Sequence, residues 1–439
     1  MHSKLVSAAF ERIRNSNLIR SFIATMMGSG LSKVILVAAT FVCSNMMTKA
    51  EFGELSFVRN TLNTVLCICA LNFAGLCTKF TTEARYSKAA MHRLAWLFLI
   101  SFGLCVVAGA GLVLLPESVL LRVLQSEMVV RYFRIIGIFL PFFMLQPLIE
   151  GVLRGLKRFK LIGILQVASS FFFLAAIYAG IRIDGLNGAM IGMMAYYMVY
   201  AIICAAAILA IRPMAGIRYR PAGIASEISV IPKMVLPVFM LSFIDAPIMW
   251  IAQLLLSRYG SMESVGSMTA VMQIRNLAIL IPSYFSGTFV AFAGDMNARR
   301  DYATYFGLFD RMQRIFLLAG TAMCVLFSLA SPWILALYGK DYVSDWPLMI
   351  VACIGIPVLM LTSLTKIDLI LQEHQQKLLY ISVAWNLLWI VALYALLAAG
   401  IVPVYSFFIS QLLGFFLQYV IILVIYKNDR KRLLHETKS

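Results

Sequence analysis

The chain has 439 residues, of which 62% are hydrophobic and 13% are charged, and its net charge at pH 7 is +17. A soluble domain carries roughly 45–50% apolar and about 25% charged residues, so this composition excludes an ordinary soluble protein and indicates an integral membrane protein. The positive charge does not indicate nucleic-acid binding, because the basic residues fall in short gaps between apolar runs and no RNA- or DNA-binding motif occurs.

The N-terminal residues 1–17 are polar and basic, and the apolar run after them is too long for the core of a signal peptide. We therefore expect a cytoplasmic N-terminal segment and no cleavable signal peptide. The eight cysteines all lie in apolar runs, and the sequence has neither a C-x-x-C pair nor a Cys/His cluster. Such a pattern predicts neither a metal site nor a disulfide framework.

Twelve apolar runs follow, each long enough to cross a bilayer as a helix, which takes about 20 residues. The sequence therefore predicts an all-α integral membrane protein with twelve transmembrane helices. The runs cover residues 18–45, 52–79, 93–115, 132–154, 161–181, 187–211, 234–258, 265–293, 315–338, 347–371, 380–400 and 404–426.

The longest gap, residues 212–233, has six runs on either side. We expect this gap to be a cytoplasmic linker between an N-lobe, residues 18–211, and a C-lobe, residues 234–426. A basic cytoplasmic tail, residues 427–439, follows the C-lobe. Counted over alternate gaps, one side of the membrane has 24 Lys and Arg residues and the other has 5. Because cytoplasmic loops are rich in Lys and Arg, the first side, which includes both termini, is predicted to be cytoplasmic.

The two halves of the chain resemble one another. The segment LPFFMLQPLIEGVLRGLKRFK (140–160) aligns without gaps on IPVLMLTSLTKIDLILQEHQQ (356–376), and Pro141 matches Pro357. The tripeptides VRN (58–60) and IRN (274–276) both fall in the second run of their half. Such repeats predict two six-helix lobes related by a pseudo-two-fold axis along the membrane normal, with a cleft suited to alternating access.

Three cations, Lys33, Arg59 and Arg275, lie well inside predicted spans. Charged residues at such depth usually face a bundle interior or a watery cavity. The acidic residues at similar depth are few, chiefly Glu54 and Asp245, so positive charge is in surplus. We therefore predict a cationic cavity that receives an anionic group, and arginine suits a phosphate because its planar fork can pair with two oxygens. The alternative is that each cation pairs with a carboxylate of another helix.

Asp245 lies midway along the seventh run, two residues before Pro247. A buried carboxylate can take up a proton near neutral pH, so Asp245 is a candidate site for coupling to H⁺ or Na⁺. The alternative interpretation, which the sequence favours, is that Asp245 is a partner for Arg275 or a polar contact between helices.

Glu150 and Lys366 occupy equivalent positions in the aligned segments of the two halves. Opposite charges at matched depth could meet as an inner gate of the cleft. The alternative, which the sequence favours, is two separate side chains that extend toward the membrane surface.

The order and spacing of several segments resemble those of bacterial polysaccharide flippases, especially the O-antigen type. These flippases belong to the multidrug/oligosaccharidyl-lipid/polysaccharide (MOP) exporter superfamily. The likeness covers residues 18–426, with one departure in the turn MMTKAEFG. The segments are EFGELSF (51–57), TEAR (82–85), VLRGLKRFK (152–160), GLNGAMIG (185–192), ESVGSMTAVMQIRNLAILIPSYFSG (263–287) and ILALYGKDYVSDWPLMIV (334–351).

The resemblance implies a non-enzymatic protein of the bacterial inner membrane. It implies that the protein moves an undecaprenyl-diphosphate-linked oligosaccharide repeat unit from the cytoplasmic to the periplasmic leaflet. In this interpretation Arg59, Arg275 and Lys33 line the substrate cavity, and no cofactor is needed beyond coupling to H⁺ or Na⁺. The expected partners are the lipid-linked oligosaccharide and membrane lipids, with a polysaccharide polymerase and a chain-length regulator as further candidates.

Two other functions stay open. A cation-coupled multidrug antiporter of the same superfamily would need acidic residues to hold cationic drugs, whereas the predicted spans contain more base than acid. A membrane glycosyltransferase or polymerase would need paired carboxylates or a large periplasmic loop with acid and base residues. The longest outer gap, residues 116–131, is short and has only Glu117 and Glu127.

Overall fold

The computed structural model describes residues 17–70, 73–84, 88–124, 126–211, 246–298, 301–372 and 374–436. Helices account for nearly all of these residues, and the described ranges contain no strand. Nine helical segments within them are long and apolar enough to cross a membrane. The predicted all-α membrane class is therefore confirmed. The linker 212–233, Asp245 and nearly all of the N-terminal segment 1–17 lie outside the described residues.

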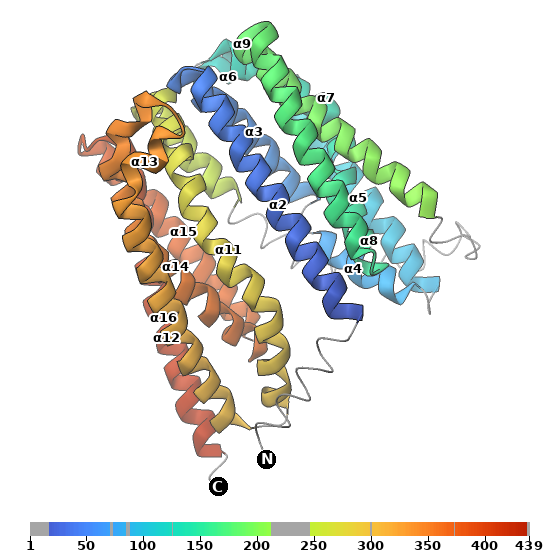
Figure 1. Ribbon diagram of the computed structural model, residues 1–439, viewed down its shortest axis with the longest axis vertical. Coiled ribbons are helices and arrows are strands. Elements are labelled where there is room, and N and C mark those ends of the chain that lie inside the picture. Colours follow the sequence, from blue (N-terminus) through green and yellow to red (C-terminus); the bar gives the residue numbers. More distant parts are fainter. Residues whose placement is uncertain are drawn as a thin grey trace. The chain divides into compact units, whose positions relative to one another are not determined.

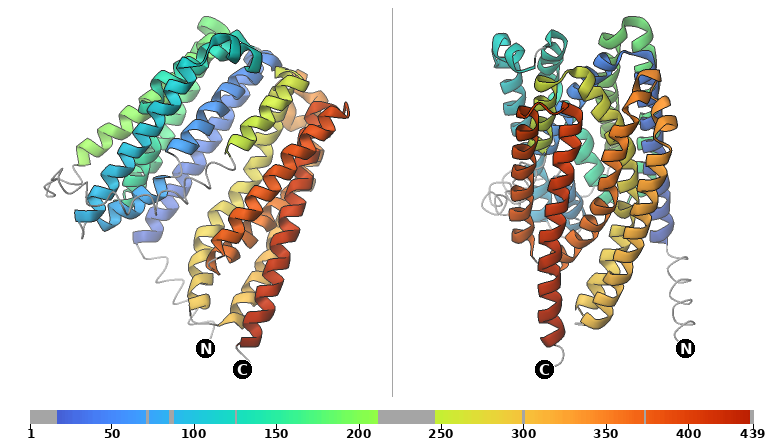
Figure 2. Two further views of the ribbon diagram at one scale, coloured as in Figure 1. Left: turned by 180° about the vertical axis from the view of Figure 1, so that it is seen from behind. Right: turned by 90° about the vertical axis from the view of Figure 1, so that its left-hand side faces the viewer.

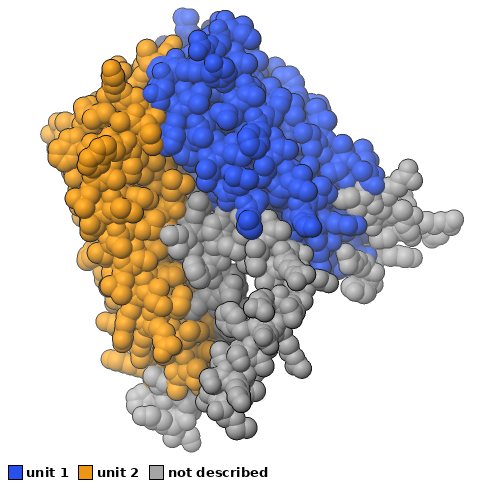
Figure 3. Space-filling view, in the orientation of Figure 1, with its two compact units in different colours: residues 1–47, 58–246 blue, residues 48–57, 247–439 orange. Residues whose placement is uncertain are grey.

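The chain forms two compact units, which Figure 3 shows in different colours. Unit 1 comprises residues 1–47 and 58–246, and unit 2 comprises residues 48–57 and 247–439. The helix that begins at Lys49 therefore contributes its first residues to unit 2 and the others to unit 1. The predicted lobe boundaries, which place this whole helix in the N-lobe, stay a prediction.

Unit 1 contains both long apolar helices and shorter ones, and the sequence did not predict one of the shorter helices, α6 (Figure 1). Its helices, together with the one it shares with unit 2, are α2 (Asn17–Met46), α3 (Lys49–Cys69), α4 (Ala74–Glu83), α5 (Lys88–Leu114), α6 (Glu117–Leu124), α7 (Glu127–Phe143), α8 (Leu145–Gly155) and α9 (Phe159–Ile211).

Two of the predicted spans are each divided into two helices. The predicted span 52–79 corresponds to α3 and α4, and the predicted span 132–154 corresponds to α7 and α8. In the second case the division is at Met144. Pro147 explains it, because a proline has no N–H to donate to the carbonyl of Phe143, four residues earlier.

The element α9 is a pair of helices joined by a turn at Asp184 and Gly185. Gly185 has a φ of 49°, a left-handed conformation that glycine adopts at little cost. The Asp184 carboxylate accepts a hydrogen bond from the side-chain amide of Asn187. The predicted spans 161–181 and 187–211 correspond to the two halves of this pair.

The two halves of α9 run antiparallel and pack closely. A Cβ atom on Gly180 would overlap the backbone of Gly188, and one on Gly188 would overlap that of Gly180. Further from the turn, the rings of Phe173 and Tyr196 have centroids 4.9 Å apart. Small residues near the turn thus permit the close approach, and aromatic rings fill the wider space beyond it.

Helix α2 lies along the first half of α9 (Figure 1). The two backbones approach closely where Gly28 faces Gly163. The contact between the two helices includes a polar pair, in which the hydroxyl of Ser29 donates a hydrogen bond of 2.6 Å to Oε1 of Gln166. Interhelical hydrogen bonds of this kind help to hold helices together in a membrane, where the hydrophobic effect does not.

In unit 2, α14 packs against α11, α12 and α16 and is its central helix (Figure 2). Residues 247–259 are helical and precede the other elements. These are α11 (Met262–Ala298), α12 (Tyr302–Leu329), α13 (Ser331–Ala336), the 3₁₀ helix η4 (Lys340–Asp345), α14 (Trp346–Leu371), α15 (Gln375–Ala398) and α16 (Pro403–Glu436).

The start of α3 packs into unit 2 against α11 and η4. A Cβ atom on Gly53 would overlap the carbonyl of Met262, and one on Gly266 would overlap the carbonyl of Lys49. The ammonium group of Lys49 also pairs with the carboxylate of Asp345 at 2.8 Å. The glycine of the EFGELSF segment is therefore required by a helix crossing.

Near the C-terminus of unit 2, α16 contacts a carboxylate of α12 and the histidine that precedes α15. The guanidinium of Arg430 lies 2.9 Å from the carboxylate of Asp310, and Nε2 of His374 lies 3.0 Å from that of Asp429. These contacts explain why α16 continues as a helix to Glu436, through most of the segment that the sequence predicted to be a tail.

Candidate functional site

Arg59 lies on α3 with its side chain half-buried. It is close enough to the Tyr197 hydroxyl and the Cys43 thiol to interact with both electrostatically. None of the carboxylates in the described ranges forms an ion pair with it. Arg59 is thus an intramembrane cation whose charge the described acidic residues do not neutralise.

Polar groups accompany Arg59 on the same face of α3. Asn63 follows four residues later, and its Oδ1 accepts a hydrogen bond of 3.0 Å from the hydroxyl of Tyr197 on α9. Asn63 on α3 and Lys33 on α2 are both exposed. Unit 1 therefore presents a guanidinium, an amide and a phenol close together, groups that can bind anions and sugar hydroxyls.

Arg275 lies on α11 and is deeply buried, with only 4% of its surface exposed. Its Nη1 donates a hydrogen bond of 2.6 Å to Oε1 of Gln411 on α16. The guanidinium also lies over the rings of Phe408 and Phe415, 5.7 Å from each centroid. A neutral amide and two aromatic faces therefore surround this charge.

No carboxylate among the described residues pairs with Arg275, and its Nε atom has no hydrogen-bond partner in this part of the chain. A buried charge without an opposite charge is costly, so such residues in membrane spans generally serve a function. Asp245, the predicted alternative partner, lies outside the described residues, so its roles stay predictions.

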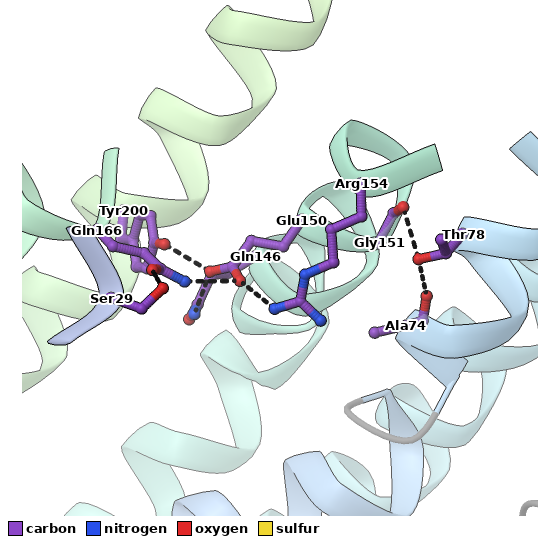
Figure 4. A network of polar contacts seen from close by, with 9 residues as sticks. All are labelled: Ser29, Ala74, Thr78, Gln146, Glu150, Gly151, Arg154, Gln166 and Tyr200. Atoms are coloured by element: carbon purple, nitrogen blue, oxygen red, sulfur yellow. Dashed lines mark hydrogen bonds and ion pairs between the residues drawn. The ribbon is translucent and has the colours of Figure 1, made fainter. Parts of the chain in front are cut away.

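Glu150 on α8 is the centre of a buried polar network in unit 1 (Figure 4). Oε1 accepts hydrogen bonds from the Tyr200 hydroxyl at 2.5 Å and from Nε2 of Gln146 at 3.3 Å. Oε2 accepts from Nε2 of Gln166 at 3.2 Å and pairs with Nη2 of Arg154 at 3.3 Å. Four donors thus satisfy this carboxylate within one unit.

The network explains why a charged residue is tolerated at this depth. Buried carboxylates are stable when they are paired and hydrogen-bonded. Lys366, the predicted partner of Glu150 in an inner gate, lies on α14 of unit 2 and is partly buried. The inner gate stays a prediction.

A second buried carboxylate, Asp368 on α14, was not singled out by the sequence. Its Oδ1 accepts a hydrogen bond of 2.6 Å from the Tyr305 hydroxyl, and Oδ2 has no hydrogen-bond partner in the described ranges. Asp368 falls two residues after Lys366 in an apolar run, so the same argument about charges inside spans would have found it. The sequence did not predict a role for Gln411, because a neutral amide inside a span indicates a functional site less strongly than a charged side chain does.

Comparison with solved structures shows what this architecture resembles. A multidrug resistance MATE family transporter of the MOP superfamily, in an inward-facing conformation, matches with a TM-score of 0.77 and 11% sequence identity, over 94% of this chain and 99% of that chain. A MOP superfamily transporter from Pyrococcus furiosus, whose reverse polarity of the binding pocket suggests a different function, matches with a TM-score of 0.64 and 13% identity, over 95% and 96% of the two chains.

A third match is a mutant of the Vibrio cholerae MATE transporter VcmN, with a TM-score of 0.63 and 16% identity over 95% of this chain and 98% of that chain. No family model matches this sequence, and no curated protein matches it. The structural matches extend over nearly the whole of each chain, and the predicted architecture of twelve helices in two lobes is consistent with them.

Proposed function

Because this chain has the fold of MOP superfamily transporters, we propose that it moves an undecaprenyl-diphosphate-linked oligosaccharide repeat unit from the cytoplasmic to the periplasmic leaflet by alternating access. The observation that supports an anionic cargo is Arg275, a buried cation that the described residues surround with an amide and aromatic rings but no carboxylate. A transporter fold with such a cation suits a negatively charged group better than a positively charged one.

The physical problem that the protein solves is the charge of the diphosphate. Moving an anion through hydrocarbon without a partner costs many kcal/mol, on the order of tens by simple solvation estimates. Arginine lowers this barrier because its guanidinium can donate two parallel hydrogen bonds to phosphate oxygens. The prenyl chain needs no such help, since it is as apolar as the membrane.

Arg59 and Lys33 provide further positive charge in this proposal. The Tyr197 hydroxyl and the Asn63 amide lie beside Arg59 and provide donors and acceptors that suit sugar hydroxyl groups. The protein would lie in the bacterial inner membrane with both termini cytoplasmic. Its product would be used by a polysaccharide polymerase and a chain-length regulator. Coupling to H⁺ or Na⁺, with Asp245 as a candidate site, belongs to the same proposal.

A multidrug antiporter is the second candidate. The MATE transporters among the matching structures favour it through the shared fold. The buried carboxylate of Asp368, with its unpartnered Oδ2, is the described group best suited to a cationic drug. Against it, the charge of Arg275, which no carboxylate in the described part of the chain neutralises, would repel such a drug. In the Pyrococcus furiosus transporter, a reverse polarity of the binding pocket suggests a different function, so a shared fold does not by itself establish an antiporter.

The test uses a host strain whose surface polysaccharide depends on this protein. We expect Arg275→Ala and Arg59→Ala to abolish surface polysaccharide and to cause lipid-linked repeat units to accumulate, with protein levels unchanged. Arg→Lys variants should retain part of the activity because they retain the charge. Arg182→Ala is the matched control, since Arg182 is exposed and lies against the ring of Tyr178.

Two results would count against this proposal. Normal polysaccharide in both the Arg59→Ala and the Arg275→Ala strains would show that transport does not need these two cations. Efflux of a cationic dye that depends on Asp368 but not on Arg275 would favour the antiporter instead.

A further inference from the structure

An apolar cavity of about 370 Å³ opens on unit 1, and its lining includes neither Arg59 nor any member of the polar network around Glu150. Its walls come from α5, α8 and the second half of α9. They include Leu94, Phe98, Ile149, Val152, Ala205 and Ile208. The cavity has the size of a small-molecule site but lacks the polar groups that would orient a polar ligand. Its chemistry therefore suits a hydrocarbon chain.

The walls of this cavity are fixed by the core behind them. Ile149 belongs to a buried cluster with Leu153 and Tyr200, and Phe98, Ala205 and Ile208 pack against the same cluster. Because packed interiors change shape little, the cavity is preformed.

Cations follow directly after the wall that α8 provides. Helix α8 ends at Gly155, three residues after Val152, and exposed Lys157, Arg158 and Lys160 come next. No carboxylate in the described ranges pairs with these three cations. Three cations within four residues, which the described carboxylates leave unpaired, therefore follow the helix that forms one wall of the apolar cavity.

One of these cations, Lys157, has a backbone conformation that is costly for a lysine. Lys157 has a φ of 60°, in the left-handed region where glycine is preferred. The amide of Lys157 donates to the carbonyl of Arg154 at 2.9 Å, and that of Arg158 to the carbonyl of Leu153 at 3.0 Å. This pair of bonds is the Schellman motif, whose left-handed residue is usually glycine. A lysine here costs stability that glycine would not, and strained backbone conformations of this kind cluster at functional sites.

We infer that the cavity binds the prenyl chain of the lipid-linked cargo, while Lys157, Arg158 and Lys160 bind its diphosphate. This inference rests on the proposed function and adds a loading site to it. Charge complementarity favours a prenyl diphosphate over a phospholipid, because a diphosphate concentrates more negative charge beside the three cations than one phosphodiester does. In this inference the site holds the lipid-linked cargo before its head group reaches Arg59 and Arg275.

The first test measures binding of the lipid without its sugars. Full-length protein in phosphatidylcholine–phosphatidylglycerol vesicles is labelled with undecaprenyl diphosphate that carries a photoreactive group in its prenyl chain. Ala205→Phe fills the cavity and is expected to reduce labelling about tenfold, the loss expected when about two methylene-sized contacts are displaced. Ala206→Phe is the matched control, because Ala206 is exposed and is not part of the cavity wall.

The second test separates the cations from the cavity. Lys157→Gly is expected to keep or raise the thermal stability of the protein, since glycine favours the left-handed conformation. It should reduce labelling by the diphosphate about threefold, as expected for one exposed ion pair. Labelling by the uncharged analogue undecaprenol should not change.

Three results would overturn the loading site. They are equal labelling of Ala205→Phe and Ala206→Phe, equal loss of diphosphate and undecaprenol labelling in Lys157→Gly, and removal of the label by excess phosphatidylglycerol, which would identify a phospholipid site. If any of these occurs while Arg275→Ala still abolishes surface polysaccharide, the loading site fails and the proposed function stands. If Arg275→Ala and Arg59→Ala leave polysaccharide normal, the proposed function fails.

Discussion

The hydroxyl of Tyr200 on α9 lies 2.5 Å from Oε1 of Glu150 on α8, and both side chains are buried. This contact joins two residues that are 50 positions apart in the sequence. It also satisfies an oxygen whose other donor, Nε2 of Gln146, is more distant at 3.3 Å. The stability of unit 1 therefore depends on a hydrogen bond to a buried charge.

Removing this hydroxyl should destabilise the protein. Tyr200→Phe leaves the ring in place but removes the short bond to Glu150, and a hydrogen bond to a charged group contributes about 1.5–3 kcal/mol. We expect a lower midpoint of thermal unfolding for the purified protein in detergent. Tyr380→Phe serves as the control, because Tyr380 is 70% exposed. Equal midpoints for the two variants would show that the bond contributes little.

The inner gate is tested by exchanging charges. Because four donors surround Glu150 within unit 1, we expect Glu150→Lys to reduce transport by disrupting this network. Adding Lys366→Glu should not restore it, since that change rebuilds none of these bonds. Recovery of surface polysaccharide in the double variant would instead show that the two residues meet.

Substitutions of Gln411 can separate the effect of the Arg275 charge on transport from its effect on the stability of the protein. Gln411→Ala removes the acceptor 2.6 Å from Nη1 of Arg275 and should destabilise the protein by about 1–3 kcal/mol, because the buried donor is left unsatisfied. Gln411→Glu should be at least as stable as the wild type, since a carboxylate pairs with the guanidinium. It should nevertheless reduce surface polysaccharide, because it neutralises the charge that we propose receives the cargo.

For each Gln411 variant, stability is measured as the midpoint of thermal unfolding, and transport is measured as the amount of surface polysaccharide. A Gln411→Glu protein with full transport would show that transport tolerates a carboxylate partner for Arg275.

The crossing of α3 and α11 should not tolerate a methyl group. Gly53→Ala places a Cβ atom against the carbonyl of Met262, and overpacking of this kind costs about 1–3 kcal/mol. Gly103→Ala is the matched control, since no atom lies within 4 Å of a Cβ at that helical position and alanine favours a helix. Thermal unfolding of both purified variants decides the matter, and the prediction fails if Gly53→Ala is as stable as Gly103→Ala.

Asp301 makes the start of α12 sensitive to acid. Its carboxylate caps the helix, and hydrogen bonds from the side chain and the backbone N–H of Thr304 lower its pKa below the ordinary value of 3.8. A lowered pKa in the folded state stabilises the protein above the pKa of the unfolded state. That contribution is lost as the pH falls through the folded value.

The stability difference between wild type and Asp301→Ala should therefore be full at about pH 7 and decrease once the pH falls below about 4. Asp301→Asn should show no such change, because asparagine caps a helix at any pH. Midpoints of thermal unfolding, measured from about pH 7 down to about pH 3, give the comparison. A wild-type advantage over Asp301→Ala that persists at the acid end would contradict the prediction.

The amino-acid sequence alone was enough to establish the class of this protein. A helix in a membrane satisfies its own backbone hydrogen bonds, so the length of each apolar run indicates a helix without reference to any other part of the chain. For the same reason the sequence correctly placed Arg59, Arg275 and Glu150 inside helices. The divisions of helices were harder to predict, because Pro147 follows a break whereas Pro141 and Pro357 lie inside continuous helices.

The partners of the buried charged side chains are known only from the tertiary structure. Arg275 meets Gln411, 136 residues away, and Glu150 meets Gln166 and Tyr200 on the two halves of α9. Helices that are apolar on all sides have no periodic pattern to show which face packs inward. Which side chains meet therefore depends on how each helix is rotated against its neighbours, and that rotation is set by packing across the whole unit.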